Sequence, residues 1–183
     1  TRLIGVVLEH VSTPFGLDMM YHMDQMAEKL GYKLYIRFSY GDQKKETQEI
    51  DFLISQKVMG LIIMPNHGVH YNTAILKLIV ERFPIVLIDK KLEGIPVPSV
   101  RTDNHAATSR LVRCLAESGC RQISLITFEE CGATSLEERK QGFYDEMASL
   151  GLSPGPECAL PFVGDMVNNE PKAAAVEIIT NFL

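Results

Sequence analysis

Short apolar runs alternate with amphipathic segments along the first half of this chain. Apolar runs bounded by turn residues are typical of parallel strands that are buried on both faces, whereas apolar residues at a spacing of about 3.6 are typical of helices. The alternation therefore predicts βαβ units, which form a parallel sheet with helices on both faces. The predicted strands cover residues 3–8, 33–39, 59–65 and 85–88, and the predicted helices cover residues 14–30, 44–57 and 72–83.

The same rhythm restarts after a connector rich in Gly and Pro at residues 93–98. We therefore predict two α/β lobes, residues 1–102 and 103–183. The second lobe has only about two and a half units, which would leave an apolar parallel edge open, so we expect it to be incomplete in this chain. A further predicted strand at 99–102 ends the first lobe. The predicted elements of the second lobe are strands at 122–128 and 158–163, and helices at 105–118, 135–150 and 170–182, with Ser135 and Glu138 spaced as a capping box.

Composition narrows the class of protein. The 183 residues are 46% hydrophobic, which suits a globular core, and the formal charge of −5 argues against a nucleic-acid-binding surface within them. No apolar run approaches the roughly 20 residues that span a bilayer, so we expect no membrane association. The four cysteines form no CxxC pair, and scattered reduced cysteines fit a cytoplasmic protein.

Signals for catalysis and metal binding are missing from the sequence. It has no GxSxG, Walker A or GxGxxG pattern, and its adjacent glutamates are not a facing pair on a helix. His67 and His70 are three residues apart in a loop, where solvation is the ordinary state. We therefore predict no enzyme, no cofactor and no metal, although an enzyme on a doubly wound scaffold stays a minor alternative.

Acidic and amide residues end two of the predicted strands. Asp89 follows the strand at 85–88, and Asp103 and Asn104 follow the strand at 99–102. Ligands of open α/β sheets bind beyond the carboxyl ends of the strands. These residues are therefore candidates for a binding site, although Asp103 and Asn104 are equally suited to cap the next helix.

Several segments, in this order and spacing, carry a family resemblance. The chain resembles the effector-binding core of the lactose-repressor (LacI/GalR) family of bacterial transcription regulators, which share the type I periplasmic-binding-protein fold. The matching segments are Ile4-Gly5-Val6-Val7, Thr13-Pro14-Phe15, Gly31-Tyr32, Gly60-Leu61-Ile62-Ile63, Pro84 to Asp89, Val97 to Val100, Asp103-Asn104, Leu115 to Gly119 with Ile123, Glu138-Arg139 and Gly142-Phe143.

The resemblance implies two Rossmann-like lobes with a sugar-like small molecule in the cleft between them. It also implies a DNA-binding headpiece before Thr1, a homodimer, a cytoplasmic location, and further chain beyond Leu183 that completes the second lobe. The alternative is a periplasmic sugar-binding protein of an ABC importer, which is monomeric and secreted. Upstream residues would separate the two, since a regulator carries a helix-turn-helix and an importer protein a signal peptide.

The resemblance also implies ligand-binding residues. Asp89 matches an acidic residue whose carboxylate accepts hydrogen bonds from two hydroxyl groups of the ligand. Arg139 matches an arginine whose guanidinium donates hydrogen bonds to adjacent hydroxyls or to a carboxylate. Phe15 matches an aromatic that lines the pocket. Asp103 and Asn104 match the hinge pair, for which ligand contact and helix capping both remain open.

Four further positions are candidates. Thr13, in Thr-Pro-Phe-Gly, replaces the asparagine of the family's Asn-Pro-Phe-Phe, and Lys90 stands where some sugar binders have arginine, so bidentate geometry is lost there. Met166 replaces a frequent aromatic, and His10 follows the first strand. These departures predict a roomier pocket, or one suited to something other than a simple pyranose.

Overall fold

The computed structural model describes residues 2–11, 14–66, 70–129, 133–160, 176–180 and 182. The chain divides into two compact units, unit 1 at Thr1–Arg101 and unit 2 at Thr102–Leu183. The division falls one residue before the boundary predicted from the sequence. Each unit is described by itself.

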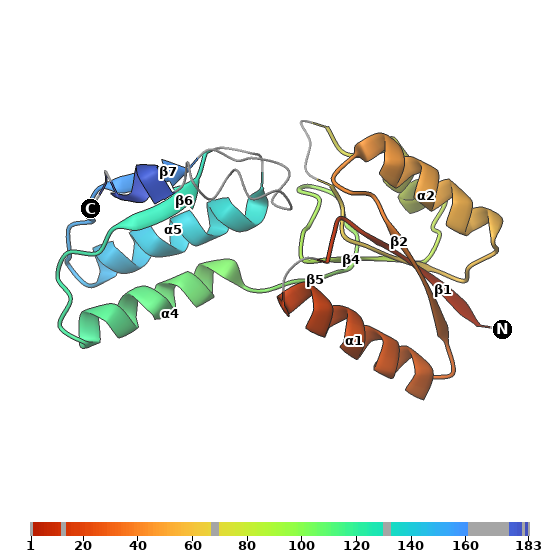
Figure 1. Cartoon of the computed structure of the whole chain (residues 1–183), viewed down its shortest axis with the longest axis horizontal. Helices are drawn as coiled ribbons and strands as arrows, with labels where there is room; N and C mark the ends of the chain where they lie inside the picture. Colours follow the sequence, from red (N-terminus) through yellow and green to blue (C-terminus); the bar gives the residue numbers. More distant parts are fainter. Residues whose placement is uncertain are drawn as a thin grey trace. The chain divides into compact units, whose positions relative to one another are not determined.

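Unit 1 is built on a five-stranded parallel sheet (Figure 1). The strand order β2-β1-β3-β4-β5 reverses direction between β1 and β3, which makes this pair the topological switch point of the sheet. The strands are β1 (Leu3–Leu8), β2 (Lys33–Phe38), β3 (Leu61–Ile63), β4 (Ile85–Ile88) and β5 (Ser99–Val100), and the helices are α1 (Pro14–Lys29), α2 (Gln43–Ser55) and α3 (Thr73–Val80).

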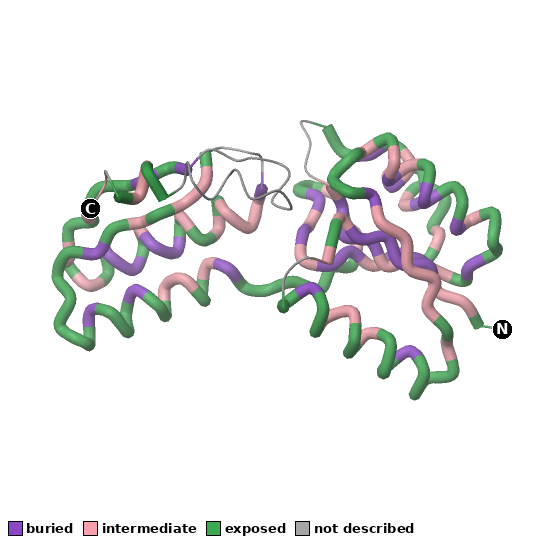
Figure 2. Tube along the Cα trace, viewed as in Figure 1, coloured by how far each residue is buried: buried purple, intermediate pink, exposed green. Residues whose placement is uncertain are grey.

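Alternate residues of β1 face two different hydrophobic clusters. Val7 belongs to the cluster under α2 and α3, whereas Val6 and Leu8 belong to the cluster under α1. Figure 1 shows α1 and α2 on opposite faces of the sheet, and Figure 2 shows the buried residues concentrated in its strands. The prediction of an α/β fold with helices on both faces is therefore confirmed.

Local signals fix the ends of these helices. The Asp42 carboxylate accepts hydrogen bonds from the first turn of α2, and the Asn72 side chain caps α3 in the same way. Gly31 has a φ of +78° just after α1, as a left-handed cap requires. Thr13, the residue before α1, lies outside the described residues.

Unit 2 contains two packed helices and a parallel pair of strands. The helices are α4 (Asn104–Glu117) and α5 (Thr134–Ser149), and β6 (Leu125–Phe128) pairs with β7 (Glu157–Leu160). Val112 of α4 and Phe143 and Met147 of α5 form the buried core with Ile123. Residues 176–180 are helical, whereas most of the predicted helix at 170–182 lies outside the described residues.

Several predictions about local structure were wrong. Strand β6 begins at Leu125 rather than residue 122, β5 ends at Val100 rather than residue 102, and α3 ends at Val80 rather than residue 83. The N-cap of α5 is Ala133 with no side-chain hydrogen bond, so Ser135 lies inside the helix and the capping box does not form. The Glu138 carboxylate accepts instead from the amide of Asn104. Strand β3 covers only Leu61–Ile63 rather than residues 59–65, although Met59 and Met64 still donate backbone hydrogen bonds to β1.

No helix in the described residues is long and apolar enough to cross a bilayer.

Candidate functional site

Polar residues follow the carboxyl ends of four neighbouring strands in unit 1. Because the strands are parallel, these ends meet along one side of the sheet, which we call the carboxyl edge, and the β1/β3 switch point lies within it. Open α/β sheets bind ligands at this place. The residues are Glu9 after β1, Ser39 after β2, Asn66 in the loop after β3, and Asp89 and Lys90 after β4.

Asp89 has a strained backbone conformation. Its φ is +63°, in the left-handed region that favours glycine. The Lys90 N–H donates to the Ile88 carbonyl at 2.7 Å, which closes a tight turn around Asp89, and the Asp89 N–H donates to Val100 at 2.9 Å. Strain held by surrounding hydrogen bonds is concentrated at functional sites. The half-buried carboxylate has no hydrogen bond or ion pair with any other described residue.

Lys90 forms an ion pair across the carboxyl edge. Its Nζ lies 2.6 Å from Oε2 of Glu9, and the exposed fractions of the two side chains are 9% and 17%. Strand β3 separates β1 from β4, so this pair joins the ends of two strands that are not neighbours. Lys90, predicted as a ligand residue, is thus already bound to a carboxylate.

A buried carboxylate organises the loop after β3. Glu46 of α2 is fully buried and accepts from the Asn66 N–H at 2.8 Å and from the Asn72 amide at 2.7 Å. Ser39 donates to the side-chain oxygen of Asn66 at 2.8 Å. Glu46 therefore holds both ends of the connection between β3 and α3.

Burial raises the pKa of Glu46 above its ordinary value. Loss of hydration penalises the carboxylate most, and hydrogen bonds from Asn66 and Asn72 oppose that effect. The nearby charge of Lys90 lowers this pKa, and that of Glu9 raises it. The sequence did not indicate this group, because Glu46 lies in the polar first turn Gln-Lys-Lys-Glu of α2, which resembles a solvated helix start.

Three predicted residues belong to helices α4 and α5 of unit 2 or to the cap of α4. Asp103 is the N-cap of α4 and accepts from the Ala106 N–H at 2.9 Å. The neighbouring Asn104 is buried, and its amide donates to Thr102 and Glu138. Arg139 follows Glu138 on α5, is exposed, and makes no hydrogen bond or ion pair with another described residue.

The remaining predicted residues are less informative. Phe15 lies in the first turn of α1 with 58% of its surface exposed, and His10 is exposed after β1. Thr13, Met166 and His67 lie outside the described residues. Among the described residues, no group of three or more metal-ligating side chains is close enough to hold an ion.

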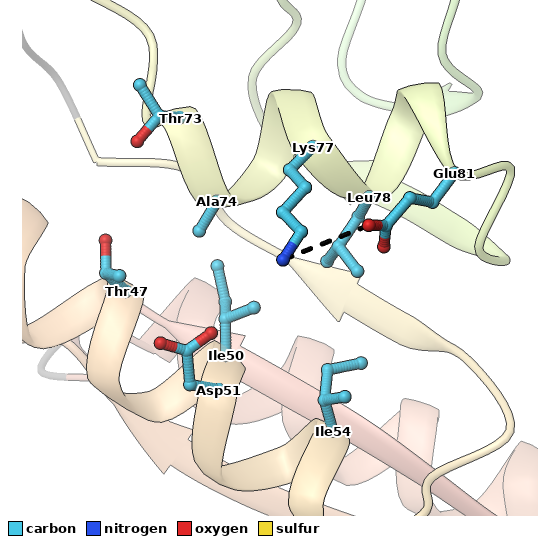
Figure 3. Close-up of a pocket in the computed structure, with 9 residues that line it drawn as sticks. All are labelled: Thr47, Ile50, Asp51, Ile54, Thr73, Ala74, Lys77, Leu78 and Glu81. Atoms are coloured by element: carbon cyan, nitrogen blue, oxygen red, sulfur yellow. Dashed lines mark ion pairs between the residues drawn. The ribbon is translucent and has the colours of Figure 1, made fainter.

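Two grooves lie away from the predicted residues. One, of about 460 Å³, runs between α2 and α3 over Ile50, Ile54 and Leu78, and the Lys77–Glu81 ion pair borders it (Figure 3). The other, of about 250 Å³, lies in unit 2 along α5, β6 and β7. None of the predicted site residues lines either groove.

Comparison with known proteins identifies the family. The family described as periplasmic binding proteins and sugar binding domain of the LacI family matches residues 1–176. The chain belongs to the LacI family. The predicted family and fold class are thereby confirmed.

Curated relatives of this LacI-family chain are named as transcriptional regulators. It is 29% identical over 154 residues to the HTH-type transcriptional regulator PtxS of Pseudomonas aeruginosa, a match that covers 84% of this chain and 44% of that protein. It is 26% identical over 151 residues to the regulator KdgR of Bacillus subtilis, covering 82% and 43%. The chain thus spans less than half the length of these relatives.

Solved structures agree in fold. The chain superposes on the Cra transcriptional dual regulator of Pseudomonas putida, in complex with fructose 1-phosphate, with a TM-score of 0.80 at 20% identity. That match covers all of this chain and 65% of the Cra chain. The regulator CcpA of Lactococcus lactis matches with a TM-score of 0.75 at 21% identity, covering 99% and 65%.

Proposed function

We propose that this chain is part of the ligand-sensing domain of a bacterial LacI-type transcription regulator, and that its effector binds at the carboxyl edge of unit 1. The observation that carries the proposal is Asp89. Its carboxylate has no partner among the described residues, and its strained turn lies beside the switch point of a parallel sheet. Family membership and the regulators among its relatives support the same function.

The carboxyl edge suits a polyhydroxylated ligand. A carboxylate accepts hydrogen bonds from two hydroxyl groups, and such charge-assisted bonds are stronger than neutral ones. Asp89 supplies this acceptor. Arg139, with its planar set of donors, and Asp103 and Asn104 are proposed as the contributions of unit 2 to effector binding.

Regulation follows from differential affinity. An effector that binds one conformation of the domain better than another shifts the population towards it, and a DNA-binding headpiece on the same chain then changes its affinity for operator DNA. Operator binding, homodimerisation and a cytoplasmic location belong to this proposal. A periplasmic binding protein of a sugar importer is the weaker alternative, because the relatives described above are regulators.

The experiment is a coupled binding assay on the protein at its full natural length. DNA duplexes selected from a random library by the protein are labelled, and their affinity is measured by fluorescence anisotropy with and without sugars from a panel. We expect one sugar to change DNA affinity by about 5- to 150-fold. Asp89→Asn should abolish the response to that sugar and leave the DNA affinity of the unliganded protein unchanged. Failure to select any DNA would contradict the proposal.

A further inference from the structure

Lys90 is the only lysine or arginine among the described residues that is buried. A buried ammonium group is costly unless a carboxylate or ligand anion compensates it. At the carboxyl edge of a ligand-binding sheet, an uncompensated lysine would be a site for a phosphate or carboxylate group. The charge of its partner therefore decides what this lysine can bind.

The partner of Lys90 is Glu9, at 2.6 Å. Both side chains are largely removed from solvent, so the interaction is screened less than a surface ion pair. Glu9 neutralises the ammonium charge but occupies only part of its hydrogen-bonding capacity, because an ammonium group has three donors. The remaining donors can serve a neutral hydroxyl oxygen.

The surroundings of this pair add negative charge. Asp89 is the neighbour of Lys90 in the chain, and its carboxylate has no partner among the described residues. The Glu46 carboxylate is close enough for both Lys90 and Glu9 to affect its pKa. Lys91, the next lysine, pairs with Glu93 at 2.8 Å. Among the described residues of unit 1, an incoming anion would meet these carboxylates and no buried cation other than the paired Lys90.

We infer that Glu9 is a specificity-determining residue: by pairing with Lys90 it restricts the carboxyl edge of unit 1 to neutral, hydroxyl-bearing ligands and rejects phosphorylated or carboxylated sugars. This inference rests on the proposed function, since it concerns the ligand class of the same site. It follows from the Glu9–Lys90 geometry of this chain, and it predicts a gain of function.

The test is calorimetry on the full-length protein with matched neutral and anionic ligands. The pairs are D-fructose with D-fructose 1-phosphate, and D-glucose with D-glucose 6-phosphate and D-gluconate. Wild-type protein should bind a neutral member at least about tenfold more tightly than its anionic counterpart. Glu9→Gln should raise the affinity for the anionic counterpart by at least about tenfold. The gain should shrink when ionic strength rises from about 0.01 M to about 0.15 M.

Two control variants isolate the cause. Adding Lys90→Gln to Glu9→Gln should cancel the gain, because the freed ammonium group is what binds the anion. Glu93→Gln makes the same charge change beside Lys91 on a more exposed pair, and it should give no gain. Circular dichroism establishes that each variant is folded.

The outcomes are distinguishable. If a neutral sugar binds to the wild-type protein and folded Glu9→Gln binds the anionic sugars no more tightly than wild type, the inference is overturned. The proposed function then still stands. The inference is also overturned if the wild-type protein prefers an anionic sugar and the Lys90→Gln variant no longer binds that sugar. This comparison needs no folded Glu9→Gln protein. Binding of none of the sugars, neutral or anionic, overturns both the inference and the proposed function.

Discussion

Gly142 of α5 lies directly against the backbone of His105 in the first turn of α4. A Cβ atom at residue 142 would overlap the His105 carbonyl oxygen and stand 3.0 Å from the carbonyl carbon. The Ser109 hydroxyl donates to the Gly142 carbonyl at 3.1 Å, which holds the two helices at this separation. Glycine is required here for close packing of α4 on α5.

Gly142→Ala should therefore destabilise unit 2. The added methyl group meets backbone atoms, which cannot rotate away, and overpacking of this kind costs about 1–3 kcal/mol in free energy of unfolding. Urea denaturation measures the change. Ser149→Ala, at an exposed position on the same helix, is the control and should stay within about 0.5 kcal/mol of wild type. Equal stability of the two variants would contradict the packing described.

The raised pKa of Glu46 makes stability depend on pH. The folded protein binds the Glu46 proton more tightly than the unfolded chain does, so this contribution to stability is fully present below the ordinary pKa of 4.5. It is lost as pH rises through the raised pKa. Glu46→Gln has no charge to bury. Its amide offers one acceptor where the ionised carboxylate offers two, so it loses one hydrogen bond relative to the ionised wild-type residue.

The melting temperature of Glu46→Gln minus that of wild type should therefore increase from pH 4 to pH 7. Thermal denaturation at a series of pH values measures this difference. Glu28→Gln, in an exposed ion pair with Lys33, should show no such trend. A difference that is constant with pH would mean that Glu46 is not penalised by burial.

Backbone strain at Asp89 predicts opposite effects on stability and binding. Asp89→Gly removes a side chain from a left-handed residue, so we expect it to raise the free energy of unfolding by about 1 kcal/mol. The same change should abolish effector binding, because the carboxylate is lost. Lys57→Gly, at an exposed residue with a φ of +57°, should stabilise similarly without affecting binding. Loss of stability in Asp89→Gly would show that the carboxylate, rather than strain, dominates at this residue.

Two variants of Asp103 separate capping from ligand contact. Asp103→Ala removes the acceptor for the Ala106 N–H and should cost about 1 kcal/mol of unfolding free energy. Asp103→Asn keeps a capping oxygen and should retain stability. If capping is the whole contribution of Asp103, the Asn variant also binds effector normally. Weaker binding at unchanged stability would assign the carboxylate to the ligand.

The order of elements in unit 1 was predictable because each signal was local. Apolar runs and helical spacing of apolar residues depend on neighbours in the chain, and the family resemblance supplied the fold class. The Glu46 network was not predictable, because its burial comes from a loop about 20 residues away in sequence that closes over a polar helix turn. The capping box failed for a related reason, since Glu138 is bound by Asn104 from another helix.

The candidate site was predictable only in outline. Asp89 was found because it ends an apolar run, and the structure places it beside the switch point. The Glu9–Lys90 pair could not be inferred, because the two residues are separated by 81 positions and meet only once β3 is inserted between their strands. The ligand roles of Phe15, Asp89, Asp103, Asn104 and Arg139 stay predictions.

The most direct measurement is calorimetric titration of the full-length protein with pentoses and hexoses, alongside Asp89→Asn and Arg139→Ala. We predict a micromolar dissociation constant, equivalent to about −8 kcal/mol, for one of these sugars. Both variants should lose that binding while retaining the wild-type melting temperature. Sugar binding that survives Asp89→Asn and Arg139→Ala would contradict the site, and the absence of binding to every sugar would contradict the function.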